Sequence, residues 1–167
     1  VKDPAVISQL VELVTKEGKS PKTEFVGKSA KYILDKIGIT VGDDVKVILM
    51  EAKEDHPFVQ VELMMPILPL VRVPDVDQAI EMAVRVEHGN RHTAMMHSRN
   101  VEKLTKMAKL IQTTIFVKNG PSYAGIGVGG EGYTTFTIAG PTGEGLTSAK
   151  SFARRRRCVL VGGMDVR

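Results

Sequence analysis

The sequence predicts an α/β fold: a three-layer unit with a mostly parallel sheet, followed by an extended C-terminal β arm. Between residues 45 and 117, strand-like and helical segments alternate, which is typical of parallel strands joined by helical crossovers. After Asn119 the chain becomes glycine-rich and offers too few large apolar residues for a core of its own. The predicted parts are therefore residues 1–119 and residues 120–167.

Two helices are predicted before the first strand. The first begins at Pro4 with Asp3 as its cap, carries apolar residues at helical spacing and ends by Gly18. Residues 19–27 are polar and indicate a loop. A second, shorter helix is predicted over residues 29–37.

The alternating part of the chain is predicted from β-branched runs, from helical periodicity and from its prolines. Asp75 caps its clearest helix, and Gln78, three residues later, resembles a capping box. The expected order is strand 45–50, loop 62–66, strand 67–73, helix 75–89, strand 92–97, helix 100–112 and strand 113–117. Beyond it we expect glycine-rich turns at 120–132 and 140–145, a β-like segment at 134–139 and a strand at 158–161.

Composition excludes several functional classes. The net charge of +4 is small for 167 residues, much of it lies in Arg154–Arg157, and aromatic residues make up only 5% of the chain. Stacking platforms are scarce and no broad basic face is indicated, so nucleic-acid binding is disfavoured. No apolar run reaches the length of a membrane span. Cys158, the single cysteine, excludes an internal disulfide and a cysteine-rich zinc site.

The recognisable motifs favour ordinary structural roles. Gly125, Gly127 and Gly130 spell G-x-G-x-x-G, but strand-like residues follow them, whereas a dinucleotide fingerprint needs a helix there. His88 and His92 have helical metal-ligand spacing, but the intervening glycine should already have ended the helix, so no metal site is predicted. For Cys158 a buried strand thiol is favoured over a nucleophile.

Glu62 is the main candidate for a functional residue. It lies in an apolar, proline-bounded loop among Val61, Leu63, Met64 and Pro66. A carboxylate in such a place must find partners. One interpretation is a ligand diol that donates two hydrogen bonds to it; the other is a backbone-capping or salt-bridged glutamate.

Longer stretches carry a family resemblance. The sequence resembles the aldehyde dehydrogenase superfamily, and more closely its CoA-acylating branch, the propionaldehyde and acetaldehyde dehydrogenases of bacterial diol and ethanolamine breakdown. The segments concerned are HPFVQVELMMPILP at 56–69, EHGNRHTA at 87–94, HSRNV at 97–101, GGEGYTTFTIA at 129–139, PTGEG at 141–145 and RRCVL at 156–160.

The resemblance implies a function for a longer parent protein. That protein would oxidise a short-chain aldehyde with NAD through a cysteine thioester, which CoA then releases. The nucleophilic cysteine of the family lies upstream of the segment that matches Val1, and Cys158 matches an arm cysteine. Together with a first residue that is not Met, this implies the later part of a catalytic domain, residues 1–119, plus a C-terminal oligomerisation arm. The fragment alone should then be inactive.

The resemblance assigns site residues and surroundings. It implies that Glu62 holds the nicotinamide ribose, that Met64 lines the nicotinamide pocket and that Pro66 shapes the same loop. It also implies a homo-oligomer, a dimer or tetramer, that forms through the arm. The implied location is the cytoplasm, either free or inside a bacterial microcompartment. The alternative hypothesis is a stand-alone binding or assembly module that acts through strand pairing of the arm, without catalysis.

Overall fold

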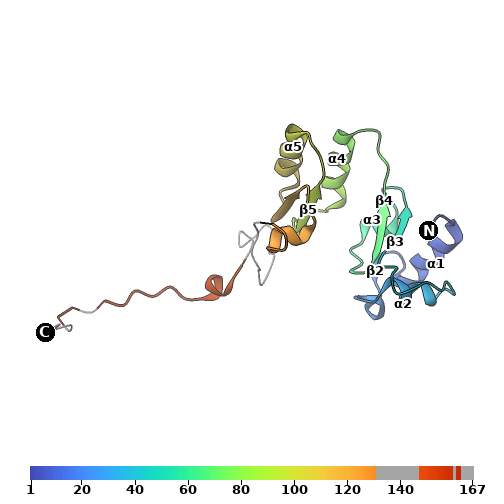
Figure 1. The fold of residues 1–167 in the computed structure, drawn as a ribbon, viewed down its shortest axis with the longest axis horizontal. Coiled ribbons are helices and arrows are strands. Elements are labelled where there is room, and N and C mark those ends of the chain that lie inside the picture. Colours follow the sequence, from blue (N-terminus) through green and yellow to red (C-terminus); the bar gives the residue numbers. More distant parts are fainter. Residues whose placement is uncertain (131–146, 160, 163–167) are drawn as a thin grey trace. The chain divides into compact units, whose positions relative to one another are not determined.

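A computed structural model describes residues 1–130, 147–159 and 161–162 (Figure 1). The chain forms two compact units, Val1–Val86 and Glu87–Arg167. Helices and short parallel strand pairs confirm the predicted α/β class. The β-like segment predicted at 134–139 and the glycine-rich segment at 140–145 lie outside the described residues, so the arm stays a prediction.

The first unit opens with helix α1 (Pro4–Val14), where the Asp3 side chain accepts the N–H of Ala5, as predicted. The helix ends earlier than Gly18 because Thr15 intervenes. Its hydroxyl donates to the carbonyl of Val11 and accepts the N–H of Gly18, so the chain turns into a small antiparallel hairpin. The loop predicted at 19–27 is therefore wrong in part, since it contains strand β2 and a 3-10 turn. The hairpin and the turn are β1 (Thr15–Lys16), β2 (Ser20–Pro21) and η1 (Thr23–Phe25).

A parallel strand pair forms the centre of this unit. Strand β3 (Ile48–Glu51) starts three residues later than predicted, and β4 (Ile67–Leu70) ends three residues earlier; the two strands pair from Ile48 opposite Ile67. The other elements are α2 (Ala30–Asp35), capped by Ser29, and α3 (Pro57–Gln60). The sequence did not predict α3, whose N-cap is the Nδ1 atom of His56, which accepts the N–H of Phe58.

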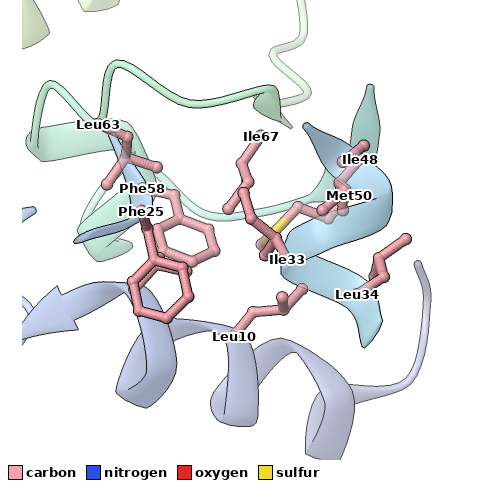
Figure 2. Packing of buried hydrophobic residues seen from close by; sticks show 11 residues of the cluster. Leu10, Phe25, Ile33, Leu34, Ile48, Met50, Phe58, Leu63 and Ile67 are labelled. Atoms are coloured by element: carbon pink, nitrogen blue, oxygen red, sulfur yellow. The ribbon is translucent and has the colours of Figure 1, made fainter. Parts of the chain in front are cut away.

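Alternation along β3 and the apolar stripes of α1 and α2 build one core. Ile48 and Met50 point inward, while the intervening Leu49 and Glu51 are exposed. Figure 2 shows the inward side chains converging from the helices, the strands and the loop before β4. The cluster consists of Leu10, Val14, Phe25, Ala30, Ile33, Leu34, Ile48, Met50, Phe58, Leu63 and Ile67.

Helix α4 (Val76–Val86) completes the first unit. The Asp75 carboxylate accepts the N–H of Gln78, which confirms the predicted cap. The reciprocal half of a capping box is replaced by a different bond, since the Gln78 side chain donates to the Asp75 carboxylate itself.

The second unit repeats a strand–helix–strand pattern. Strand β5 (Thr93–Met96) and strand β6 (Ile115–Lys118) are parallel, with helix α5 (Val101–Ile111) between them in sequence. The three elements confirm the predictions to within about two residues at each end, which is the usual uncertainty of element boundaries. Two 3-10 turns follow, η2 (Ser122–Ile126) and η3 (Ala149–Phe152).

Candidate functional site

The loop between α3 and β4 carries all three predicted site residues. Glu62 is exposed, Leu63 is buried, and Met64 is exposed again to 56%. Leu63 lies in the core cluster together with Phe58 (Figure 2). The apolar setting that singled out Glu62 is therefore explained by Leu63, which anchors the loop while its neighbours face solvent.

Main-chain hydrogen bonds hold this loop on the rigid part of the unit. At its start the N–H of Val61 donates to the carbonyl of Pro57, and at its end the N–H of Ile48 donates to the carbonyl of Pro66 over 2.7 Å. In the middle the N–H of Gly27 donates to the carbonyl of Met64 over 3.0 Å. A loop held in this way can position side chains as a fixed scaffold does.

Glu62 itself offers an open carboxylate. Within the described part of the chain it has no hydrogen bond or ion pair, so the backbone-capping or salt-bridged interpretation has no support there. An exposed carboxylate of this kind can accept hydrogen bonds from two adjacent hydroxyl groups. Those are the groups that a ribose diol presents.

A groove of about 590 Å3 lies beside the loop, and Met64 and Pro66 form one of its walls. Glu62 belongs to the same loop but does not line this groove. The facing walls come from the turn before α2 and from the segment before β3. Their residues are Gly27, Lys28, Ser29, Ala30, Lys31, Asp43, Val45 and Lys46.

Those facing walls are not predicted by the sequence. Its local patterns indicate only a loop, a helix start and a turn in these two segments, since nothing in their spacing links them to the residues around Glu62. The concentration of lysines was the available signal. The main-chain bonds from Gly27 to Met64 and from Ile48 to Pro66 show that both segments lie against the loop.

Positive charge predominates in the groove. Lys31 Nζ lies 3.0 Å from Asp43 Oδ1, and this hydrogen bond, with the attraction between the charges, raises the pKa of Lys31 and lowers the pKa of Asp43. Lys46 Nζ donates to the main-chain carbonyl of Asp43. Lys28 Nζ lies 5.5 Å from the centre of the Tyr32 ring. The groove is thus lined by three ammonium groups and one carboxylate, and among the described residues only Lys31 pairs with that carboxylate.

A second groove, of about 840 Å3, lies between α1, α4 and the ends of β3 and β4, and contains none of the predicted site residues. Two of its lining carboxylates are paired: Glu51 with Arg72, and Glu54 with Arg85 through two hydrogen bonds of 2.8 and 3.0 Å. The Arg85 guanidinium holds the pKa of Glu54 below its usual value. The remaining charged lining residues, Lys53 and Asp55, have opposite signs, so this groove has no excess of positive charge.

The other motifs are settled by local geometry. Gly127 and Gly129 have positive φ, and a Cβ on Gly125 would clash with the Ile115 side chain, so turn and packing demands account for these glycines. Cys158 is exposed and lies outside any strand, so the buried strand thiol predicted for it is wrong for this chain. Across the described residues no cluster of three potential metal-ligating side chains occurs, and no helix is long and apolar enough to cross a membrane.

Known proteins identify the family. The sequence profile of the aldehyde dehydrogenase family matches residues 45–143, more than half of the chain. The chain belongs to the aldehyde dehydrogenase family. This aldehyde dehydrogenase chain is 52% identical over 165 residues to a CoA-propanoylating propanal dehydrogenase of Salmonella typhimurium. It is 50% identical over 158 residues to the acetylating acetaldehyde dehydrogenase EutE of the same organism.

Solved structures give the same result. A propionaldehyde dehydrogenase of Rhodopseudomonas palustris, with bound CoA and an acylated cysteine, is 71% identical and matches 96% of this chain with a TM-score of 0.89. One from a fucose utilisation microcompartment of Clostridium phytofermentans is 47% identical, with a TM-score of 0.86 over 100% of this chain. This chain spans 35% of the length of the Salmonella relative and 36% of the Rhodopseudomonas chain, which is about a third in each case.

Proposed function

We propose that this chain is the C-terminal part of a CoA-acylating aldehyde dehydrogenase that converts a short-chain aldehyde to its acyl-CoA with NAD. The observation that carries the proposal is the 71% identity, over 96% of the chain, to a propionaldehyde dehydrogenase with bound CoA and an acylated cysteine. In this proposal the nucleophilic cysteine lies outside this chain. Cys158 is the only cysteine in the sequence, and it matches a cysteine in the C-terminal arm of the family.

The described loop fits a nucleotide cofactor. The free carboxylate of Glu62 accepts hydrogen bonds from the nicotinamide ribose, while the exposed Met64 side chain offers an apolar surface to the nicotinamide ring. Pro66 keeps the loop in register with β3 through its carbonyl. NAD, when bound, supplies the hydride acceptor. Covalent catalysis then divides the reaction into acylation of the cysteine and transfer of the acyl group to CoA.

The test compares the intact protein with the 167-residue chain. We expect the intact protein to reduce NAD in the presence of propionaldehyde and CoA, and to carry a propionyl group on one upstream cysteine when CoA is withheld, detected by mass spectrometry. We expect the 167-residue chain alone to show neither. NAD- and CoA-dependent oxidation by the chain alone would overturn the assignment of the nucleophile, and an inactive intact protein would overturn the function.

We also propose that the arm joins subunits of a homo-oligomer, dimer or tetramer. Val159 and Val161 are 69% and 88% exposed, which is unfavourable for β-branched apolar side chains unless another surface covers them. Light scattering of the intact protein and of a variant that lacks residues 150–167 tests this. We expect the deletion to lower the oligomeric state, and an unchanged mass would contradict the proposal. A stand-alone assembly module predicts that the chain by itself oligomerises and that the intact protein lacks the activity.

A further inference from the structure

The groove beside Met64 and Pro66 has more cationic groups than its own structure uses. Asp43 is the one carboxylate among its lining residues, and it already pairs with Lys31 over 3.0 Å. Lys46 donates to the main-chain carbonyl of Asp43, and its charge makes a small contribution to the lowered pKa of that carboxyl, while Lys28 lies over the face of a tyrosine ring. Neither Lys28 nor Lys46 forms an ion pair within the described residues. Both are exposed at the groove, so two positive charges remain available to an anion.

The position of the groove indicates which anion it receives. One wall is the loop that carries Glu62, Met64 and Pro66, and the opposite wall is tied to that loop by the bond from Gly27 to Met64. A ligand that lies along Met64 therefore meets the lysines within the same cavity. Ammonium groups bind phosphate as point charges without the planar geometry that guanidinium groups require.

We propose that Lys28 and Lys46 bind a phosphate group of the nucleotide ligand, either CoA or the nicotinamide dinucleotide, in the groove beside Met64. The volume of about 590 Å3 accommodates a phosphate with part of its adjoining ribose or pantetheine. Lys31 acts differently: its pairing with Asp43 fixes the wall of the groove. This inference rests on the proposed function, because it takes the nucleotides of that reaction as ligands.

The chain provides a matched pair of variants for the test. Lys28 and Lys36 both place their ammonium groups over the Tyr32 ring, at 5.5 and 5.1 Å, but only Lys28 lines the groove. Lys28→Ala and Lys36→Ala therefore remove the same kind of contact with Tyr32, whereas only the first removes a groove charge. Lys28→Arg keeps the charge and serves as the conservative rescue.

Steady-state kinetics of the intact protein give the first readout. For Lys28→Ala and Lys46→Ala we expect the KM of one nucleotide to rise about fivefold each, as loss of one solvent-screened charge contact implies. We expect kcat to stay within about twofold and the salt dependence of KM to weaken. Lys36→Ala and Lys28→Arg should behave as wild type. Identical KM values for Lys28→Ala and Lys36→Ala would overturn the proposal.

The choice of nucleotide identifies the phosphate. If the KM rises with CoA but not with dephospho-CoA, the lysines bind the 3′-phosphate of CoA. If it rises with both, they bind the diphosphate of CoA. If it rises only with NAD, they bind the diphosphate of the dinucleotide. Titration calorimetry with CoA and NAD separates this site from the proposed reaction. If the wild-type protein is inactive but binds a nucleotide, and Lys28→Ala binds that nucleotide more weakly, the phosphate site is supported and the proposed function is overturned. A wild-type protein that binds neither nucleotide overturns both.

Discussion

Gly27 and Met64 meet through a 3.0 Å hydrogen bond, and both have left-handed backbones, with φ of 72° and 54°. The bond joins the turn before α2 to the loop that carries Glu62. Because nothing lies within 4 Å of the position of a Gly27 Cβ, only the backbone conformation demands glycine there. The shape of the loop therefore depends on a conformation that other residues adopt at a cost.

Gly27→Ala tests this dependence. We expect the free energy of unfolding of the intact protein to fall by about 1 kcal/mol, the usual cost of a left-handed alanine, and the KM for NAD to rise as the loop shifts. Gly38→Ala is the matched control, because Gly38 has φ of 76° with equally open space and makes no bond to the loop. Urea denaturation should show equal losses for the two variants, while a kinetic change in both would contradict the role of the bond.

Glu62→Gln tests the ribose contact. The change keeps the shape of the side chain and removes its charge, so we expect nucleotide binding to weaken by about 1–3 kcal/mol through loss of charge-assisted hydrogen bonds. Thermal stability should not change, because the side chain is exposed and unpaired among the described residues. Glu24→Gln, at a second exposed glutamate, is the control. Wild-type affinity for NAD in Glu62→Gln would remove this residue from the site.

The sequence predicted the loop but not the groove, and the difference has a physical reason. Helical periodicity and capping residues depend on neighbours a few positions apart, so α1, α4 and α5 were predicted within a few residues. The groove depends on a contact between residues 27–31 and 62–66, which no local pattern contains. Helix α3 was missed because its cap is a histidine nitrogen, His56 Nδ1, whereas sequence signals for helix starts rest on oxygen-bearing side chains.

His56 should make stability depend on pH. Partial burial lowers the pKa of His56 below its usual 6.5, and only the neutral ring can accept the N–H of Phe58 through Nδ1. A histidine whose pKa is lowered by folding contributes stability that is complete above pH 6.5 and is lost as the pH falls below that value.

The measurement is the melting temperature of the intact protein between about pH 7.5 and 5, a range that spans the ordinary histidine pKa. His56→Asn retains a side-chain acceptor that does not titrate, so we expect its melting temperature to fall less on acidification than that of wild type. His97→Asn, which changes a histidine in another unit, should keep the wild-type slope. Equal slopes in all three proteins would show that the His56 cap does not respond to pH.

Leu49 and Leu68 are directly opposite each other on β3 and β4, yet they are 49% and 56% exposed. Leu70 on β4 and Val47, just before β3, are exposed as well, whereas Ile48, Met50 and Ile67 on the other face of the pair lie in the core. Parallel strands normally bury both faces. Because the chain spans about a third of the length of its relatives, we expect the remainder of the intact protein to cover the exposed leucines.

Leu68→Lys distinguishes a covered face from an open one. If the leucine is covered, the intact protein should lose about 1.5–3 kcal/mol of stability, the contribution of one buried leucine side chain. In the 167-residue chain the same change should reduce self-association, measured by light scattering, because it breaks an exposed apolar patch. Val101→Lys, at a position on α5 that is 69% exposed, should have little effect on stability. Equal stability of the two variants in the intact protein would mean that β4 is open to solvent there too.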